Sequence, residues 1–416
     1  MQKTACTVVL ALSTGMACAA ENWPQFRGPT CNGQTDATDL PITWGEDKNV
    51  TWKTAIHDRG WSSPVIWGDQ VWMTTATKDG KELFAVCVDR KTGKIVHDVK
   101  VFDVRKPDKI NALNSYASPT PAVEPGRVYV HFGTYGTACL DTATGKTLWS
   151  RRDLNCDHSM GPGSSVLLYG KLVILTLDGM DVQYLVALDK ATGKAVWKAN
   201  RSTDFRGVDP DQRKAYGTPT VIDVAGRKQV VTCGAGAAIA YDPATGKEIW
   251  KCRYKGGYSN VSRPIRAGQF VLVNSGFSRA RLYAVRPDGR GDVTETHVVW
   301  QYTRSVPVKP SVAVVDGLVF MTSDNGGVLT CLDAETGRAV WTERLGGRYS
   351  ASPVVAGKRI TFFDDRGTAT VIEAGRRYKK LAVNTLASGC MASAAVAGNA
   401  LFVRTKTHLY RIERRK

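Results

Sequence analysis

A short motif that recurs along the chain constrains the fold more than any other feature of the sequence. Its clearest copy is the run from Leu188 to Gly193, which reads Leu-Asp-Lys-Ala-Thr-Gly and precedes Trp197 by four residues. The aspartate can accept hydrogen bonds from backbone two residues on, and glycine adopts the positive φ that closes a tight turn. Each copy therefore predicts two antiparallel strands joined by a turn. The other copies are at 88–93, 140–145, 241–246 and 332–337.

The tryptophans that follow the motif recur like the blades of a β-propeller. Their intervals are about 41 to 53 residues, a period typical of repeat folds built from strands. These tryptophans are Trp149, Trp197, Trp250, Trp300 and Trp341, while His97 holds the slot in the first copy. The segments between them lack the apolar spacing of three and four residues that a helical solenoid needs. The pattern therefore predicts an all-β fold.

Counting the strand groups predicts eight blades. The last group, within 393–412, supplies only three strands, and a lone strand around Trp52 precedes the first blade. Because ring closure removes open sheet edges, we expect the strand at Trp52 to complete the last blade. The predicted fold is an eight-bladed β-propeller of four-stranded antiparallel blades over 49–416, closed by this N-terminal strand. Residues 21–48 are expected to be irregular and to pack against it through their aromatic side chains.

Residues 1–20 are expected to be a secretory signal peptide. Lys3 precedes an apolar run from about Ala5 to Leu12, and small residues stand before Glu21. A lipid anchor on Cys18 is disfavoured because the residues before it do not suit lipidation. We therefore expect an exported protein of the periplasm or the extracellular space.

The cysteines do not point to a metal site. Removing the leader leaves eight of the ten cysteines, an even number that allows disulfides in an exported chain. Cys87, Cys139 and Cys331 stand two residues before the repeat aspartate, where other copies have alanine, which predicts small buried side chains. No Cys-x-x-Cys motif occurs, so zinc ribbons and attached haem are not indicated. Pairing among the other five cysteines stays open.

The formal charge of +18 indicates a basic surface. The lysines and arginines are spread through turns rather than gathered in one stripe, which disfavours nucleic-acid binding. A surface that faces an anionic membrane or polymer is one alternative for an exported protein, and solubility without a specific partner is another.

The segments that enter the first strand of each blade are expected to surround one mouth of the central channel. Aligned on their prolines, six of them place a hydroxyl side chain just before the proline: Ser63, Ser118, Ser165, Thr218, Ser352 and Ser393. Two neighbouring blades place Arg263 and Lys309 there instead. Adjacent cations repel unless an anion lies between them, and arginine binds carboxylate or phosphate through two donors. The open alternative is that both side chains reach solvent or pair with local acids such as Asp316.

Aromatic residues join the same mouth in this alignment. Trp61, Tyr116 and Tyr216 precede the proline position by three residues, which suggests a site for an acidic or aromatic ligand. His158, beside Cys156 and an aspartate, is the other feature out of step with the repeat. Adjacent residues rarely point to one spot, so we favour a loop histidine near the mouth over a catalytic or metal-binding one. No catalytic residue and no metal ligand set is predicted.

The repeat Leu-x-Ala-Leu-Asp-x-x-Thr-Gly-Lys-x-x-Trp around an eight-fold ring resembles the pyrroloquinoline-quinone (PQQ) repeat family. Trp23-Pro24-Gln25-Phe26-Arg27-Gly28 and the run Asp-His-x-x-Gly-Pro-Gly-Ser-Ser at 157–165 are similar to a bacterial exported branch that is PQQ-binding-like or BamB-like. The resemblance implies that one tryptophan per blade docks onto the next blade. These docking residues would be Trp52, Trp149, Trp197, Trp250, Trp300 and Trp341.

The resemblance implies two alternative functions. Quinoprotein dehydrogenases of the family bind PQQ and calcium over the channel, oxidise an alcohol or sugar, and usually carry a vicinal disulfide, which this sequence lacks. BamB-like members keep the ring without the cofactor and serve in outer-membrane assembly. We favour an exported, non-catalytic and monomeric scaffold, and we expect it to need no cofactor. It would bind an outer-membrane or periplasmic protein or an anionic ligand. The alternative is a PQQ-dependent dehydrogenase with calcium.

Overall fold

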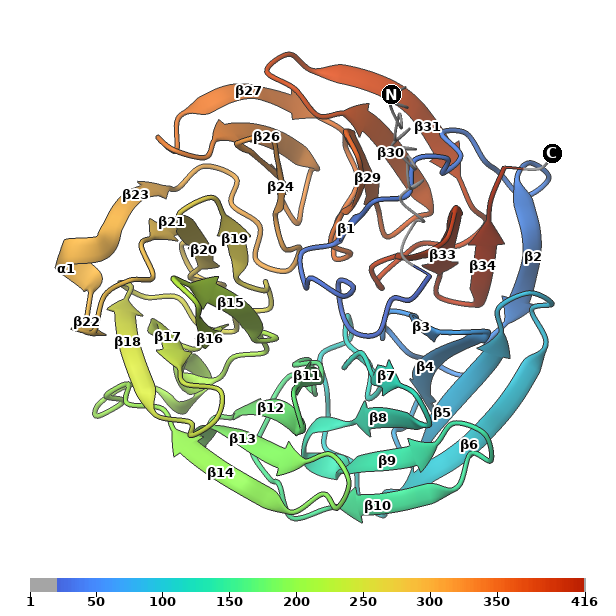
Figure 1. The fold of residues 1–416 in the computed structure, drawn as a ribbon, viewed down its shortest axis with the longest axis horizontal. Helices are drawn as coiled ribbons and strands as arrows, with labels where there is room; N and C mark the ends of the chain where they lie inside the picture. The colour runs from blue at the N-terminus through green and yellow to red at the C-terminus, as the bar shows by residue number, and fades with distance from the viewer. Residues whose placement is uncertain (1–20, 415–416) are drawn as a thin grey trace, which may run out of the picture.

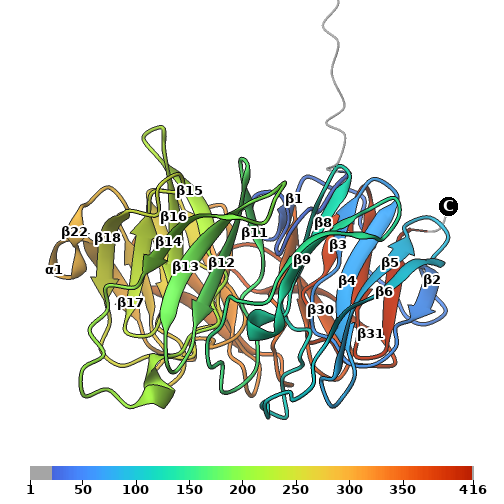
Figure 2. The ribbon, with the colours of Figure 1, turned by 90° about the horizontal axis from the view of Figure 1, so that it is seen from below.

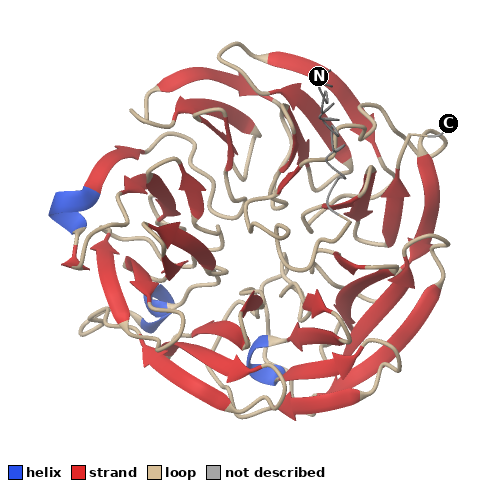
Figure 3. Ribbon diagram, viewed as in Figure 1, coloured by secondary structure: helices blue, strands red, loops and turns tan. Residues whose placement is uncertain are grey.

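The computed structural model describes residues 21–414 and confirms the all-β propeller (Figures 1 and 3). Eight antiparallel sheets surround a central channel, and the helical elements among the described residues are single turns. These are η1 (Gly133–Tyr135), η2 (Pro210–Arg213) and α1 (Thr294–His297). No helix in this part of the chain is long and apolar enough to cross a membrane. The predicted signal peptide, 1–20, lies outside the described residues.

The first four blades follow the chain from the inside of the ring outward. Blade 1 contains β3 (Val65–Trp67), β4 (Gln70–Ala76), β5 (Glu82–Asp89) and β6 (Ile95–Asp103). Blade 2 contains β7 (Ala122–Glu124), β8 (Arg127–His131), β9 (Thr137–Asp141) and β10 (Thr147–Arg151). Blade 3 contains β11 (Leu167–Tyr169), β12 (Leu172–Asp178), β13 (Gln183–Asp189) and β14 (Ala195–Asn200). Blade 4 contains β15 (Thr220–Val224), β16 (Arg227–Cys233), β17 (Ala237–Tyr241) and β18 (Glu248–Arg253).

The remaining blades repeat this order and include two short additions. Blade 5 contains β19 (Ile265–Ala267), β20 (Phe270–Asn274), β21 (Leu282–Val285) and β23 (Val298–Tyr302). Blade 6 contains β24 (Ala313–Val315), β25 (Leu318–Thr322), β26 (Val328–Asp333) and β27 (Ala339–Arg344). Blade 7 contains β28 (Val354–Ala356), β29 (Arg359–Phe363), β30 (Thr368–Glu373) and β31 (Lys379–Thr385). The additions, β22 (Gly291–Asp292) and β1 (Gln34–Thr35), pair in parallel with β18 and β28.

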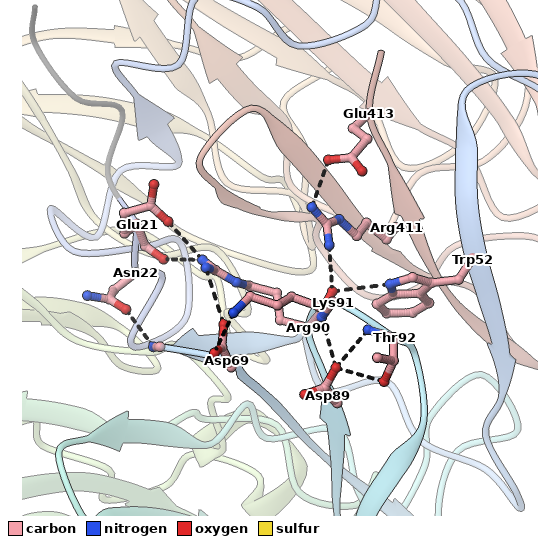
Figure 4. Close-up of polar contacts among 11 residues, drawn as sticks. Glu21, Asn22, Trp52, Asp69, Asp89, Arg90, Lys91, Thr92, Arg411 and Glu413 are labelled. Carbon is pink, nitrogen blue, oxygen red and sulfur yellow. Dashed lines mark hydrogen bonds and ion pairs between the residues drawn. The ribbon is translucent and has the colours of Figure 1, made fainter. Parts of the chain in front are cut away.

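Blade 8 joins the two ends of the ring, as the sequence predicts. Its strands from the inside are β32 (Ala395–Ala397), β33 (Ala400–Arg404) and β34 (His408–Ile412), and β2 (Val50–Ala55) completes the outer edge. Figure 4 shows the contacts that join blade 8 to blade 1. The carbonyl of Arg90 accepts hydrogen bonds from the Trp52 indole at 3.1 Å and from the Arg411 guanidinium at 2.9 Å. The Arg90 side chain forms ion pairs with Glu21 and Asp69.

The repeated turn has the geometry that its sequence requires. In the copy before Gly193, the Asp189 carboxylate accepts from the Thr192 backbone at 2.9 Å and from the Thr192 hydroxyl at 2.8 Å. These hydrogen bonds lower the pKa of Asp189, because they favour the charged carboxylate. Gly193 closes the turn with φ of 69°. The turns at 89, 141, 242 and 333 repeat these bonds.

The turn of each such blade receives an aromatic side chain from the blade before it. The indole of Trp149, for example, donates to the carbonyl of Lys190, the residue after the turn aspartate, at 2.9 Å. Trp52, Trp197 and Trp300 donate in the same way across their own blade boundaries. Trp341 donates to the Gly375 carbonyl of blade 7 at 3.0 Å, although the turn there lacks the aspartate. His97 occupies this position between blades 1 and 2, with its Nε2 3.2 Å from the Thr142 carbonyl. The interaction therefore recurs wherever the turn motif is intact, and histidine can replace tryptophan in it.

Trp250 differs because the turn it would meet is replaced in blade 5. Its indole donates to the side-chain oxygen of Gln229 at 2.8 Å, within its own blade. The amide of Gln229 in turn donates to the carbonyl of Pro287, in the substitute turn of blade 5, at 3.1 Å. The glutamine thus relays the contact to the next blade.

The interior of the ring is filled by apolar clusters that lie between neighbouring blades. One cluster joins Val65 and Trp72 of blade 1 to Val123 and Val130 of blade 2. All eight cysteines in the described residues are buried and free, so no disulfide forms among them. Cys87, Cys139 and Cys331 are fully buried, as their alanine-like positions predict.

Glycine at the end of the turn is needed for two separable reasons. A Cβ on Gly337 would lie 2.5 Å from the Trp300 ring. A Cβ on Gly317, in the turn between β24 and β25, would meet no atom within 4 Å. Both residues have positive φ, of 67° and 73°. We predict that Gly337→Ala lowers the free energy of unfolding by about 1–3 kcal/mol more than Gly317→Ala, since overpacking adds to the backbone strain. Urea unfolding of both variants measures the difference. Equal losses would contradict a packing role for the indole.

Candidate functional site

The antiparallel strand order gives the disk two different faces. Loops that join one blade to the next, and turns between second and third strands, open on one face, called here the mouth face. Turns that carry the Asp-x-x-Thr-Gly motif lie on the opposite face. Figure 2 shows β1 near the upper, opposite face, and green and teal loops extending below the lower, mouth face.

The N-terminal segment 22–35 closes the channel at the face opposite the mouth. Trp23 is buried and pairs with Ile66 of blade 1 through backbone bonds of 2.9 and 2.8 Å. The Pro24 carbonyl accepts from Val123 of blade 2, and further contacts reach blades 3, 6 and 7. Figure 1 shows this segment in dark blue across the centre of the ring. The predicted irregular segment is therefore a plug that is bonded to several blades across this end of the channel.

Arg263 holds this plug rather than lining the mouth. It is 2% exposed, its guanidinium lies over the Phe26 ring, and it donates to the Phe26 carbonyl. Its other nitrogens donate to Thr220 Oγ1 at 2.8 Å and to the Pro219 carbonyl at 2.7 Å. The predicted pairing of Arg263 with Lys309 around a shared anion is therefore not what the geometry shows.

The hydroxyl ring predicted around the channel exists, and it joins the blades. The backbone N–H of Ser63 in blade 1 donates to Thr120 Oγ1 in blade 2 at 2.9 Å. The backbone N–H of the equivalent residue in most other blades likewise donates to the side-chain hydroxyl of the next one. One series runs Thr120, Ser165 and Thr218, and the other runs Arg263, Ser311, Ser352, Ser393 and Ser63. This bond is replaced between blades 4 and 5, where Arg263 stands in the hydroxyl position and its side chain reaches back to blade 4.

Alignment on proline put two residues of this ring in the wrong register. Thr120 and Ser311, not Ser118 and Lys309, stand two residues before the innermost strands of blades 2 and 6. Blade 2 has two prolines close together, and blade 6 has its proline two residues early. Lys309 consequently belongs to the mouth, and the ring contains only one cation, Arg263.

Above the plug, the channel holds a cavity of about 400 Å³ that opens on the mouth face. Phe26 of the plug reaches it, and ring residues such as Ser63, Ser165 and Ser352 line its wall. Its apolar lining is Trp61, Leu113, Met160, Tyr216, Tyr258, Val261, Phe277, Val308 and Met391. Its charged lining is Asp211, Lys214 and Lys309. Aromatic residues and methionine, the types enriched in protein interfaces, thus surround the entrance.

Three of the six predicted mouth residues line the cavity. Trp61 lies at the entrance with its indole donating to the Leu113 carbonyl at 3.0 Å. Tyr216 lines the wall and donates its hydroxyl to the carbonyl of His158 at 2.6 Å. Lys309 lies 3.8 Å from Asp324, whose carboxylate also accepts from the Lys309 backbone at 3.0 Å. Burial raises the pKa of Asp324.

Tyr116 and His158 lie behind the lining. The Tyr116 hydroxyl donates to the Asp108 carbonyl at 2.6 Å, and its ring packs edge-on against Tyr135. His158 is 8% exposed, and its Nε2 accepts from the Thr134 backbone N–H at 3.0 Å. Because that nitrogen needs a free lone pair, the imidazole is neutral, and burial lowers its pKa to about 4. His158 therefore positions Tyr216 through its backbone and is not an exposed acid or base.

The residues around the cavity carry more positive than negative charge. Lys214 pairs with Asp211, and Lys309 lies beside Asp324, so these four side chains balance. Beneath the floor, Arg27 and Arg263 are both buried, and neither forms an ion pair with a described carboxylate. Burial, with the like charge of Arg263, lowers the pKa of Arg27 to about 9. The two guanidiniums give the blind end of the channel a positive field that favours an anionic group there.

The donor set of the cavity does not fit calcium. Calcium takes six to eight oxygen ligands and prefers carboxylates. Asp211 is the one carboxylate that lines the described cavity, and it is bound to Lys214. No group of three or more histidine, cysteine or acidic side chains with metal-binding geometry occurs in residues 21–414. The described lining therefore lacks the oxygen-rich set of ligands that calcium requires.

Comparison with known proteins identifies both branches that the repeat resembles. A family model described as outer membrane protein assembly factor BamB matches residues 45–290 and 291–380. The quinohemoprotein alcohol dehydrogenase ADH IIB of Pseudomonas putida is 32% identical over 149 residues, which cover 32% of this chain and 19% of that protein. The chain thus matches about a fifth of that relative's length.

Solved structures share the fold at low sequence identity. The quinohemoprotein alcohol dehydrogenase of Comamonas testosteroni superposes with a TM-score of 0.70 at 12% identity, covering 94% of this chain and 80% of that one. BamB from Moraxella catarrhalis superposes with a TM-score of 0.61 at 14% identity, covering 87% of this chain and 99% of that one. At such identities the likeness establishes the propeller alone.

Substitution of Arg263 should loosen the plug without loosening the blades of the propeller. Arg263→Ser restores a hydroxyl in the ring but removes the bonds to Phe26 and Pro219. We predict that amide hydrogen exchange in residues 24–35 accelerates at least tenfold, while protection in the blade strands is retained. Lys309→Ser, which removes a cation that lines the cavity but does not contact the plug, is the control and should leave exchange in the plug unchanged. Unchanged plug exchange in Arg263→Ser would contradict its latching role.

Burial of neutral His158 should make the fold less stable in acid. Its pKa is about 4 in the folded chain and about 6.5 when unfolded, so the unfolded state binds the extra proton between these values. The contribution of neutral His158 to the free energy of unfolding is therefore complete above pH 6.5 and is lost as the pH drops toward 4. We predict that His158→Gln reduces the slope of unfolding free energy against pH in this window by up to about 1.4 kcal/mol per unit.

His57 provides a control of opposite sign. Burial works against it, but hydrogen bonds to Asp58 and Asp98 raise its pKa above the ordinary value. Its contribution is present below pH 6.5 and is lost as the pH rises through the folded value. His57→Gln should therefore remove the gain in stability that acidification brings in the window just above pH 6.5, and it should leave the slope between pH 4 and 6.5 unchanged. Identical pH profiles for both variants would contradict the assignment of charge states.

Proposed function

This chain belongs to the family described as outer membrane protein assembly factor BamB, and from that membership we propose that it is a non-catalytic binding scaffold of the cell envelope. Its binding site is the open mouth of the central channel. The occupant is a segment of a partner protein, with an apolar tip that enters the mouth and an acidic group that faces the positive end of the channel. The observation that carries this proposal is the blind, aromatic-lined cavity above Arg27 and Arg263.

Exposed apolar side chains at the rim support a protein partner. Leu113 and Phe277 are 56% and 55% exposed, and both line the cavity. Leu113 comes from the loop after β6, and Phe277 from the turn between β20 and β21, so blades on different sides of the ring contribute them. Large exposed apolar residues grouped around one opening are typical of protein interaction sites. Met160 and Met391 add flexible side chains that adapt to a partner's shape.

The second candidate is a PQQ-dependent dehydrogenase acting on an alcohol or sugar. The quinohemoprotein relatives favour it, and the cavity volume of about 400 Å³ suits a small aromatic acid. Lys309 and Lys214 would hold its carboxylates, and the quinone would supply the oxidising group. Against it stands the lining, which offers calcium only the paired carboxylate of Asp211.

Site-specific photo-crosslinking tests the mouth. A photoreactive residue replaces Phe277, and the matched control replaces Val383, which is 54% exposed on the outer strand of blade 7. We predict cross-links to one envelope protein from position 277 and none from position 383, and loss of those cross-links on adding Leu113→Asp. Equal labelling at both positions would contradict a dedicated mouth.

A calorimetric titration with PQQ, with and without calcium, separates the two candidates. The scaffold proposal predicts no calcium-dependent binding and no dye-linked oxidation of alcohols or sugars. Calcium-dependent binding together with turnover would replace the scaffold by the dehydrogenase.

A further inference from the structure

A second cavity, of about 300 Å³, lies beside the mouth and has a different character. Its walls are the turn between β4 and β5, the loop after β6, and the segment that leads into β3. Arg59, Lys78 and Lys109 line it together with Thr77, Asn111 and Ser115. We call it the cationic cleft. It shares Asn111 with the channel cavity, so the two openings lie next to each other on the mouth face.

The three cations of the cleft form no ion pair within the described chain. None of Arg59, Lys78 and Lys109 forms an ion pair with a carboxylate of residues 21–414, and no acidic side chain lines the cleft. The neighbouring cavity provides a contrast, since Asp79, Glu82 and Asp103 line it with Lys81 and Arg105. There, Lys81 pairs with Asp79 at 3.4 Å. The cationic cleft holds no such pair, although the pKa of Tyr116 in its wall is raised by burial and, to a smaller extent, by the nearby carboxylates of Asp108 and Asp79.

Arg59 is held in place before any ligand arrives. Its guanidinium lies 5.1 Å from the centre of the Trp61 ring, and one nitrogen donates to the Ala112 carbonyl. Its Nε is buried and has no hydrogen-bond partner. A fixed guanidinium loses little conformational entropy on binding, and arginine suits phosphate and sulfate because its planar fork matches their oxygens.

We propose that the cationic cleft binds a multiply charged oxyanion, namely the diphosphate, phosphate or sulfate group of a larger molecule. Three cations without an ion-pair partner match two or three negative charges better than the single charge of a carboxylate. The volume exceeds that of one inorganic phosphate and accommodates a diphosphate or a lipid headgroup. Lys78 and Lys109 are exposed and close on the anion, while Arg59 sets its position. This site goes beyond the partner-binding mouth and does not depend on it.

The test uses inorganic pyrophosphate as the probe, titrated into the full mature chain at constant ionic strength. The variant Lys78→Gln/Lys109→Gln should weaken binding at least tenfold. The matched control, Lys94→Gln/Lys146→Gln, removes the same charge from two exposed turns on the opposite face and should change the dissociation constant less than twofold. Arg59 is left intact because it also holds Trp61 and Ala112.

Two further arms distinguish the source of the oxyanion. Sedimentation with phosphatidylglycerol vesicles, against phosphatidylcholine vesicles, tests a headgroup, and pyrophosphate alone tests a free ligand. Loss of either interaction in the cleft variant but not in the control supports the proposal. No binding in both arms, or equal weakening in both double variants, overturns it. Cross-linking from position 277 is the independent readout of the mouth, so failure of one site is distinguishable from failure of the other.

Discussion

The ring depends on hydrogen bonds that join neighbouring blades at two distances from the central channel. Near the outer edge of the ring, an indole N–H donates to the carbonyl of the residue after the turn aspartate, as Trp149 does with Lys190. Around the channel, a backbone N–H donates to a hydroxyl of the following blade, as Ser63 does with Thr120. Apolar side chains fill the space between, but packing alone has no direction. The polar contacts at both radii fix the angle between blades, and eight repetitions of that angle close the ring.

Blade 5 departs from the repeat at both radii, and each departure has a compensation. Its turn motif is replaced, so Trp250 reaches the substitute turn through Gln229. Its ring hydroxyl is replaced by Arg263, whose side chain restores the link to blade 4 and also fastens the plug. The exception to the repeat is therefore the place where the ring acquires its blind channel. Because the departures are confined to one blade, the contacts of the repeat are kept at the other blade boundaries.

The candidate site was only partly predictable from the sequence. Trp61 and Tyr216 stand two residues before the ring hydroxyls of Ser63 and Thr218 and line the cavity, as the repeat predicts. Lys309 stands in the equivalent position before Ser311, although alignment on proline predicts it in the ring itself. Tyr116 lies behind the cavity because the residue two positions before Thr120 is Ser118, and Ser118 lines the cavity in its place. His158 belongs to a loop outside the repeat, where its ring accepts from the Thr134 backbone. The register of Thr120 was missed because a second proline stands in the same segment. Leu113 and Phe277, at the rim, belong to loops outside the repeat, and the repeat pattern carries no signal for them.

The sequence by itself determined the number of blades, their strand order and the closure by the strand at Trp52. It could do so because these depend on local turn chemistry and on a period that each copy repeats. Only the tertiary structure decided that residues 22–35 plug the channel, that Arg263 turns inward to hold them, and that Arg59, Lys78 and Lys109 meet in one cleft. Those features join segments far apart in the chain, and no local pattern encodes the side to which a lone arginine turns. The repeat therefore specifies the scaffold, and its non-repeating residues specify the sites.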